Sequence, residues 1–435
     1  LNLNGNPAVL DGFSVTGGNA FVTPAGFTDD PGGGAIQVEG ARNVHLENLT
    51  VRGNQASSVV GVGGGINGRE SELTIRDSVI RNNRSYLNGG GLSFSTKGNV
   101  SIEDTHILEN VFIDAIGQCL VQVSGGGGIY QARGPLSLTN VVMERNVADC
   151  QGGGLKRFGG SLHMYGGAFL NNEVRPSQIS PFWSSGGGLA WVDSGNMWID
   201  SVLFMGNRAE YNGGAFDLAS PTTGGTSAVG ITNSTFVANK ATDAGVLDLN
   251  VDRDSTLVLE NVIIWDNEGD QQDGFGLILL AGPLNPGSGI GNSLVQGSGA
   301  PALWNTRYGP DLGGNIDTTP DFVQPPVGTA PNVSGDFRLN LGSPAIDVGL
   351  NSAVTYPKDN DGNPRIFNTT VDMGAYETQV VCPAGGTTRL YVDAHASGAG
   401  TGASWADALP SLQNALTLAH RCPSNSIDEI WVAQG

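Results

Sequence analysis

Three tryptophans have side chains suited to binding sugars. Trp183 ends a long proline-containing segment, and Trp191 and Trp198 follow it closely. Aromatic faces can stack on sugar rings, but aromatic residues on a long loop can equally pack together as a small satellite core. The sequence therefore leaves two alternatives open for these residues: a contact site for cell-surface glycans, or a local apolar cluster.

Two acidic residues indicate a metal site only weakly. Asp359 and Asp361 stand before Gly362 as in part of a calcium-binding loop, but the spaced oxygen ligands that should follow are missing. A turn rich in Asp and Asn has the same composition. We therefore expect no metal or other cofactor, with calcium as the weak alternative.

Four cysteines are placed so that two disulfides would form. Cys119 and Cys150 each stand shortly before a glycine cluster, one repeat apart, so stacking of the repeats described below would bring them together. Cys382 and Cys422 each precede a proline near the end of the chain. The hypothesis of disulfides Cys119–Cys150 and Cys382–Cys422 implies an oxidising, extracytoplasmic compartment. Four cysteines allow three pairings, and four free buried thiols are the alternative.

Catalysis on a polysaccharide would need carboxylates, or a bound calcium ion with a basic residue, gathered on one exposed strip. The sequence shows no Asp-Asp pair at facing positions of neighbouring repeats, and basic residues are scarce. The histidines are scattered along the chain: His45, His106, His163, His395 and His420. We therefore predict no catalytic residues and no enzyme, with a polysaccharide lyase or hydrolase as the alternative.

A repeated element must position these side chains. Between residues 32 and 267 a pattern of about thirty residues recurs, with a glycine cluster, two strands and an apolar-x-x-Asn corner. The last glycines of the clusters are Gly34, Gly65, Gly91, Gly128, Gly154, Gly188, Gly214 and Gly245. The corner asparagines are Asn54, Asn83, Asn110, Asn146, Asn172, Asn207, Asn239 and Asn267. The glycine and asparagine series recur with matching spacing over eight repeats, which indicates a solenoid.

The apolar residues of each repeat alternate as in strands with one buried face, for example Val44-His45-Leu46-Glu47. Short strands cornered by glycine predict an all-β fold, a parallel β-helix of about ten coils and on the order of 50 Å in length. Asparagine tolerates the left-handed conformation of a corner. On successive coils, the corner asparagines are expected to bond to each other in a structural ladder. A ligand groove lined by these asparagines is the alternative.

Composition excludes several classes of protein. The chain has 67 glycines without a collagen period, and its 39% of hydrophobic residues is too much for a disordered chain. No apolar run is long enough to span a membrane. The net charge of −20 argues against nucleic acid as a partner, and against tight binding of polyanionic sugars.

The chain divides into three predicted parts. Residues 1–323 are expected to form coils, residues 324–380 a polar terminal module, and residues 381–435 a small strand-helix-strand capping segment. The expected helix is capped by Ser404 and has one apolar stripe, formed by Trp405, Leu409, Leu412, Leu416 and Ala419. Such a segment suits the cover of an open solenoid end.

Two sets of motifs resemble known bacterial proteins. Gly-Gly before an apolar residue, paired with Phe-x-x-Asn as at Phe169–Asn172, Phe204–Asn207 and Phe236–Asn239, resembles the repeats of polymorphic outer-membrane proteins. Gly-Ser-Pro-Ala-Ile-Asp (342–347) and Asp-Met-Gly-Ala-Tyr-Glu (372–377) resemble the terminal module of choice-of-anchor surface proteins. The resemblance implies a right-handed β-helix that is secreted to the bacterial cell surface. It supplies no catalytic residues.

The last segment resembles the beginning of such a β-helix, whereas residues 1–31 already have the pattern of a coil. We expect either one window of a tandem array, or a subunit whose C-terminal segment docks on the next subunit. A circular permutant is disfavoured, because residues 378–389 reach only about 40 Å. The expected function is structural or adhesive, with further copies of the chain as end-to-end partners and cell-surface glycans as the other candidate partner.

Overall fold

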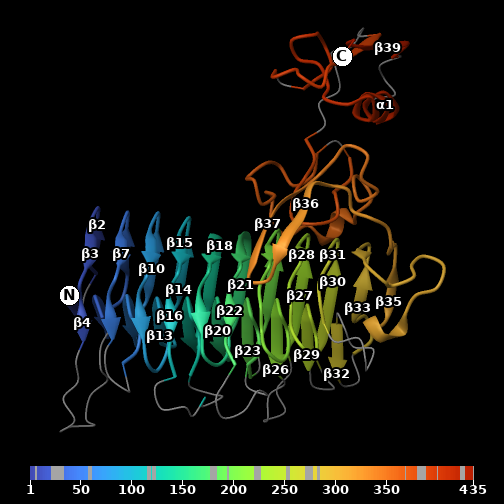
Figure 1. Ribbon diagram of the computed structural model, residues 1–435. Helices are drawn as coiled ribbons and strands as arrows, with labels where there is room; N and C mark the ends of the chain where they lie inside the picture. Colours follow the sequence, from blue (N-terminus) through green and yellow to red (C-terminus); the bar gives the residue numbers. More distant parts are fainter. Residues whose placement is uncertain are drawn as a thin grey trace.

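In the computed structural model the chain forms an all-β, right-handed parallel β-helix, which confirms the predicted fold class (Figure 1). The structure describes residues 1–4, 7–20, 34–56, 61–114, 119, 124–176, 184–193, 195–219, 227–250, 255–269, 278–281, 285–367, 369–379, 388–398, 400–421 and 427–434. Within these residues no helix is long and apolar enough to cross a membrane.

Each coil contributes one strand to the first sheet, whose ten strands are all parallel. They are β1 (Asn2–Asn4), β5 (Ile36–Glu39), β9 (Ile66–Arg69), β13 (Leu92–Ser95), β17 (Ile129–Ala132), β20 (Leu155–Phe158), β23 (Leu189–Val192), β26 (Phe216–Ala219), β29 (Leu247–Asn250) and β32 (Ile278–Ala281).

The second sheet is bent, because most coils cross it as two strands joined by a corner. Its first half comprises β2 (Val9–Asp11), β3 (Ser14–Thr16), β6 (Val44–Glu47), β7 (Thr50–Arg52), β10 (Leu73–Arg76), β11 (Val79–Arg81), β14 (Val100–Glu103), β15 (His106–Leu108) and β18 (Leu136–Glu144). Its second half comprises β21 (Leu162–Leu170), β24 (Met197–Asp200), β25 (Leu203–Met205), β27 (Ala228–Thr232), β28 (Thr235–Val237), β30 (Thr256–Glu260), β31 (Ile263–Trp265), β33 (Gly289–Gly291), β34 (Leu294–Val295) and β35 (Asp311–Gly313).

A narrow third sheet closes the coils. It comprises β4 (Asn19–Ala20), β8 (Gln55–Ala56), β12 (Arg84–Ser85), β16 (Val111–Phe112), β19 (Val147–Ala148) and β22 (Glu173–Val174). Equivalent residues stay in register from coil to coil, so like side chains stack inside the rod. The rings of Phe169 and Phe204 are 4.8 Å apart, and those of Phe204 and Phe236 are 4.7 Å apart. This continuous core is what a single coil could not bury alone.

The glycine clusters are needed for conformation and for space. Gly89, the first of its cluster, has φ +57°, which favours glycine, and a Cβ on Gly90 would collide with the carbonyl group of Gly127 on the next coil. A Cβ on Gly91 would lie 3.0 Å from Cγ of Asn110. The glycine corner and the asparagine corner therefore touch, which explains why the two series keep step along the sequence.

The left-handed corner residue is not the one we expected. None of the eight corner asparagines has a positive φ; the residue before each of them does, as in Asn82, Glu109 and Arg145. A second set of left-handed residues, including Asn48, Asp77 and Asn140, forms the bend between the paired strands of the second sheet. Asn and Asp are enriched there because their side chains tolerate this conformation.

The segment from residue 320 to 379 packs on the flank of the rod and does not extend it (Figure 1). It contains the antiparallel hairpin of β36 (Phe322–Thr329) and β37 (Asn332–Leu339), and a short 3-10 turn at Asn351–Ala353. Another 3-10 turn, Thr306–Tyr308, precedes this segment. Phe322, Val333 and Phe337 pack on outward side chains of the second sheet. We call residues 320–379 the flank module.

The C-terminal unit consists of the parallel strands β38 (Arg389–Val392) and β39 (Glu429–Val432), and helix α1 (Leu412–Arg421). The helix begins later than predicted: Ser411 Oγ accepts a hydrogen bond from Asn414 N at 3.1 Å, while Ser404 Oγ accepts one from Asp407 N in a preceding turn. The predicted stripe is correct for Leu409 and Ala419, which pack in the apolar cluster, and wrong for its other three residues. Ala415 and Leu418 are buried with Leu409, whereas Trp405, Leu412 and Leu416 are exposed.

Candidate functional sites along the rod

The corner asparagines form a continuous hydrogen-bonded ladder. In each step the backbone N–H and the side-chain Nδ2 of one asparagine both donate to Oδ1 of the asparagine on the next coil. Between Asn83 and Asn110 both distances are 3.0 Å. Nδ2 also donates to a carbonyl of the preceding coil, as from Asn110 to Ile80 at 2.9 Å. The same contacts join Asn54, Asn83, Asn110, Asn146, Asn172, Asn207, Asn239 and Asn267.

This ladder lies inside the rod. Asn83, Asn110, Asn146, Asn172, Asn207 and Asn239 are fully buried. Each amide satisfies a backbone N–H and a carbonyl that the tight corner would otherwise leave unpaired, and unpaired buried groups are costly. With no exposed amide in this part of the series, the arrangement serves stability and offers no groove to a ligand.

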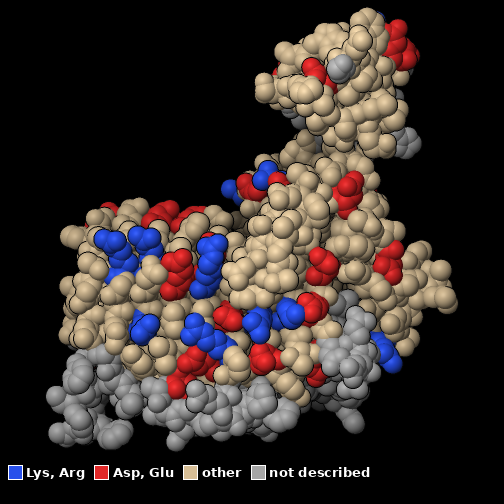
Figure 2. Space-filling view, viewed as in Figure 1, with Lys and Arg blue, Asp and Glu red and all other residues tan. Residues whose placement is uncertain are grey.

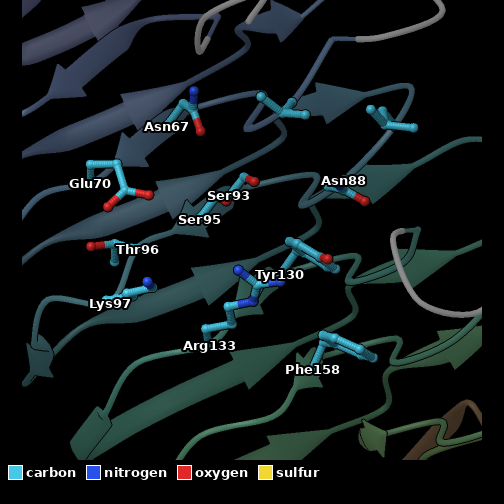
Figure 3. A pocket seen from close by; sticks show the side chains of 13 residues that line it. Asn67, Glu70, Asn88, Ser93, Ser95, Thr96, Lys97, Tyr130, Arg133 and Phe158 are labelled. Carbon is cyan, nitrogen blue, oxygen red and sulfur yellow. The ribbon is translucent and has the colours of Figure 1, made fainter. Parts of the chain in front are cut away.

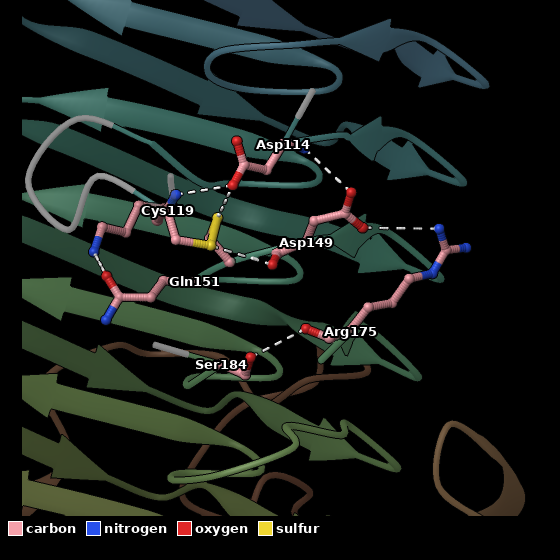
Figure 4. The surroundings of a disulfide bond; sticks show 8 residues. Asp114, Cys119, Asp149, Gln151, Arg175 and Ser184 are labelled. Atoms are coloured by element: carbon pink, nitrogen blue, oxygen red, sulfur yellow. Dashed lines mark hydrogen bonds and ion pairs between the residues drawn. A yellow bond between two sulfur atoms is a disulfide. The ribbon is translucent and has the colours of Figure 1, made fainter. Parts of the chain in front are cut away.

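Figure 4 shows the disulfide between Cys119 and Cys150, whose Cα atoms are 5.6 Å apart on neighbouring coils. Asp114 Oδ2 accepts a hydrogen bond from Cys119 N at 2.8 Å, and Phe112 packs with the disulfide. Because the two sulfurs are bonded to each other, they are not thiolate ligands for the metal ion that their closeness to Asp114 would otherwise allow. The second cysteine pair, Cys382 and Cys422, lies outside the described residues.

Trp191 and Trp198 do not share one sugar-binding surface. Trp191 is fully buried in the core, because it stands at an inward position of β23 two residues after the inward Leu189. The expectation of a glycan contact at Trp191 is therefore wrong. Trp198 is half-buried on the outer face of β24, with its ring edge-on to His163 at 5.2 Å. Trp183 lies outside the described residues.

Asp359 and Asp361 belong to the polar core of the flank module. Asp359 is buried, and its Oδ1 accepts hydrogen bonds from Asp361 N at 3.0 Å and Asn363 N at 2.7 Å. Its Oδ2 accepts from Glu377 N at 2.9 Å. Asp361 lies 3.6 Å from Arg338. Both oxygens of Asp359 are thus engaged by backbone N–H groups, as in a turn built around an Asp side chain.

Sequence reasoning missed a pair of facing carboxylates. Asp217 of β26 and Asp248 of β29 are partners in register on the outer face of the first sheet. Each stands three residues after the last glycine of its cluster, Gly214 and Gly245. Counting from the glycine clusters would have aligned them, although they are 31 positions apart in the sequence. Lys156 occupies the equivalent position two coils earlier.

Burial dominates the titration of this row. It raises the pKa of Asp217 well above its usual value, and the neighbouring Asp248 carboxyl raises it further, while Lys156 opposes both. Burial also raises the pKa of Asp248 to about 6, against the hydrogen bond from Asn212 Nδ2 at 2.5 Å. Burial lowers the pKa of Lys156 to about 7, although Asp217 raises it.

The Lys156 amine donates a hydrogen bond to Gln151 Oε1. A lowered amine pKa two coils from a raised carboxyl pKa is the kind of perturbation found at proton-transfer sites. However, Lys156, Asp217 and Asp248 are all buried, so a polymer does not reach them in this arrangement.

A groove lies on the same outer face, nearer the N-terminus, over β9, β13, β17 and β20 (Figure 3). It has a volume of about 420 Å³ and is lined by amides, hydroxyl groups, apolar side chains and charges at the neighbouring turns. Lining residues include Asn67, Asn88, Ser93, Tyr130 and Phe158. None of these residues stood out in the sequence, because each is single within its own coil.

The surface charge is mixed. Figure 2 shows Lys and Arg interspersed with Asp and Glu on one face of the rod. Neighbouring coils are joined by ion pairs such as Arg76–Glu103 at 2.9 Å and Arg208–Glu173 at 3.6 Å. These pairs are partly exposed and contribute little stability. This face therefore lacks the continuous basic stripe that nucleic-acid binding requires.

Comparison with known proteins supports the fold and goes no further. A search of curated proteins finds no match to the chain. Residues 10–204, from the first coil to β25, match the family model described as the right-handed β-helix region.

Proposed function

We propose that this chain is a structural and adhesive component of an extracellular cell surface, in which β-helix rods continue end to end. The observation that carries the proposal is an apolar face left uncovered on the C-terminal unit, whose parallel strands match those of the rod. The disulfide Cys119–Cys150 supports an oxidising location outside the cytoplasm.

The first coil presents apolar side chains and open strand edges. Val9 is 69% exposed and Phe13 is 56% exposed. Among the described residues, β1, β2, β3 and β4 each pair on one side only, with strands of the second coil. Unpaired edges of this kind accept a further strand.

The C-terminal unit offers a matching surface. On α1, Leu412 and Leu416 are one turn apart and are 47% and 49% exposed, while the opposite face of the helix is buried. Trp431 and Val432 of β39 are also exposed. Because β38 and β39 are parallel, like the strands of the rod, this unit can continue a parallel β-helix. Its occupant is a first coil like residues 1–20, on another copy or on a further coil of one tandem polypeptide.

Sedimentation velocity over a range of protein concentrations tests this docking. Association should grow with concentration and give linear rods in electron micrographs. Replacing Leu416 by Glu should abolish it, because the new charge would be buried at the contact. Val327→Glu, at an exposed position of β36, is the matched control and should associate like the original protein. A protein that stays monomeric at all concentrations, or associates equally with Leu416→Glu, would contradict end-to-end docking.

A second candidate function is glycan binding, which the groove over β9 to β20 favours. Polysaccharide cleavage is the enzymatic version of this candidate. Incubation with polysaccharides separates the two, because a lyase releases unsaturated ends and a hydrolase releases reducing ends, whereas a binding protein releases neither.

A further inference from the structure

We infer that the groove over β9, β13, β17 and β20 binds one carboxylate-bearing sugar unit of an otherwise neutral glycan. The inference rests on the second candidate function, glycan binding, and is independent of end-to-end assembly. Three features of the groove carry it: an aromatic wall with hydroxyl groups, a buried amide oxygen without a partner, and two cations at one end.

The wall and floor suit a sugar ring. The half-buried Phe158 of β20 contributes aromatic surface and Ser95 of β13 an exposed hydroxyl group, while the buried side chains of Tyr130 and Ser93 lie behind them in the floor. Burial raises the pKa of Tyr130 to about 12, so its phenol stays protonated at neutral pH. Sugar rings have apolar C–H faces and hydroxyl edges, and this lining offers a surface for each.

Asn88 offers the groove a hydrogen-bond acceptor. Its backbone is bridged to Val62 and Gly125 on the neighbouring coils, and its side chain lines the groove. The residue is 8% exposed, yet its Oδ1 has no hydrogen-bond partner among the described residues. Buried amide oxygens are normally satisfied, and a sugar hydroxyl group is a suitable donor.

Two cations meet at one end of the groove. The chain at Gly134 packs directly on the backbone of Lys97, and Figure 3 shows Lys97 and Arg133 close together at these turns. Within the described part of the chain neither forms an ion pair within 4 Å. Arg133 is close enough to Tyr130 for its charge to lower the pKa of the phenol, against the larger effect of burial. An unpaired cation pair is unexpected on a chain of net charge −20 unless it receives an anion.

The groove suits a ligand with one carboxylate and not a polyanion. Glu70 lines the groove one coil before Lys97, and it would repel a second carboxylate while accepting hydrogen bonds from sugar hydroxyl groups. The negative field of the whole protein also disfavours a polyanion. One acidic sugar unit, with its carboxylate at Lys97 and Arg133 and its neutral neighbours along the groove, meets both conditions.

Calorimetric titration of the intact protein tests the inference. The acidic probes are sialyllactose and aldotriouronic acid, and lactose and xylotriose are their neutral counterparts. We expect at least one acidic probe to bind about tenfold more tightly than its neutral counterpart, a difference of about 1.4 kcal/mol, because its carboxylate forms charge-assisted hydrogen bonds. The preference should weaken with added salt.

Variants locate the site. The double variant Lys97→Gln with Arg133→Asn should lose the preference for acid while keeping the neutral affinity; asparagine suits the φ of +65° at Arg133. Asn88→Ala should weaken acidic and neutral probes alike. Arg42→Gln, an exposed position in the equivalent turn two coils before Lys97, removes the same charge outside the groove and should change nothing. Thermal unfolding of each variant checks that the fold is intact.

The outcomes separate the two levels of the proposal. If neutral and acidic probes bind equally, or the double variant keeps the acid preference, the acidic-sugar inference is overturned while glycan binding stands. If none of the four probes binds, both are overturned.

Discussion

The outer face of the second sheet is built differently in the two halves of the rod. One row of equivalent residues runs along it in register: Arg52, Arg81, Leu108, Glu144, Leu170, Met205, Val237 and Trp265. In the N-terminal coils this row is charged or partly exposed. In the later coils Met205 and Val237 are buried beneath the flank module.

In the covered half, corner asparagines also form hydrogen bonds with the flank module. Asn171 has a left-handed backbone, and its amide exchanges two hydrogen bonds with Val333 of the flank module, at 3.0 and 2.8 Å. Asn261 does the same with Leu350, at 3.0 and 2.7 Å. In the open half, Asn48 and Asn140 instead bond to Asp11 and Asp104 of the preceding coils. These residues have a left-handed backbone in both halves, and Asn261 also donates to Asn233 of the preceding coil at 2.9 Å, so the bonds to the flank module are what distinguishes the covered half.

The difference shows where a β-helix carries its specific information. The inward rows and the asparagine ladder continue through both halves unchanged, because every coil needs them. The outward positions are free to vary, and in this chain they distinguish a docking surface from a solvent-exposed surface. Substitutions at equivalent outward positions should therefore have unequal effects, and substitutions of this kind test the comparison.

The largest effect is expected from Val237→Asp. Val237 is fully buried between the rod and the flank module, and a carboxylate there has no cation within the apolar cluster to pair with. An uncompensated buried charge costs about 3–5 kcal/mol, so the module should detach from the rod. Hydrogen exchange of the amides in β36 and β37 measures the loss of protection.

Leu108→Asp is the matched control, since Leu108 occupies the same row in the open half and is only half-buried. Its effect should stay below about 1 kcal/mol, as for most surface substitutions. Equal destabilisation by the two variants would show that the halves do not differ as described.

A smaller effect is expected from Asp200→Ala. Its Oδ2 accepts hydrogen bonds from Thr355 N at 2.9 Å, Thr355 Oγ1 at 2.6 Å and Tyr356 N at 3.0 Å, which fasten the flank module to β24. Removing the carboxylate leaves two partly buried backbone N–H groups without this acceptor and should cost about 2 kcal/mol. The loss of stability is measured as a lower midpoint of urea unfolding, with cleavage of the module by a protease as the readout.

The equivalent residue in the open half is Glu103, whose ion pair with Arg76 is partly exposed. Glu103→Ala should therefore cost no more than about 0.5 kcal/mol. If Glu103→Ala destabilised the protein as much as Asp200→Ala, the docking role of Asp200 would be refuted.

The fold followed from the sequence because its two strongest signals are local. Glycine and asparagine recur at the corners, and inward apolar residues alternate between them. The same alternation would have placed Trp191 inside, two residues after Leu189. The sequence left Trp191 between a glycan contact and a packed cluster, because its aromatic neighbours were considered and its parity within the strand was not.

The outer-face features were not predictable in the same way. The facing of Asp217 and Asp248 depends on exact register across a full coil, and docking of the flank module joins residues such as Gly167 and Asn360 that are 193 positions apart. One local signal was present: Leu203-Phe204-Met205 is apolar at every position, so a strand with both faces buried was indicated. The partner that covers its outer face could be found only in the structure.

The last effect concerns pH and should be confined to the covered half. Glu377 is buried in the flank module; burial first, and then the charge of Asp372, raise its pKa to about 8, although Arg365 and two backbone N–H groups oppose this. Burial also raises the pKa of Asp372 to about 6. The folded module therefore holds protons that the unfolded chain releases from about pH 4 upward, so its stability is greatest at low pH and falls as the pH rises toward 8.

Hydrogen exchange in β36 and β37 should accelerate over this window beyond its intrinsic pH dependence, while exchange in β7 and β11 should not. Glu377→Gln should flatten most of the dependence, because glutamine has the same shape without the titrating group. Asp248→Asn is the control, since it removes a titrating carboxyl from the first sheet and should leave the profile of the module unchanged. A profile that keeps its full slope in Glu377→Gln would assign the titration to another group.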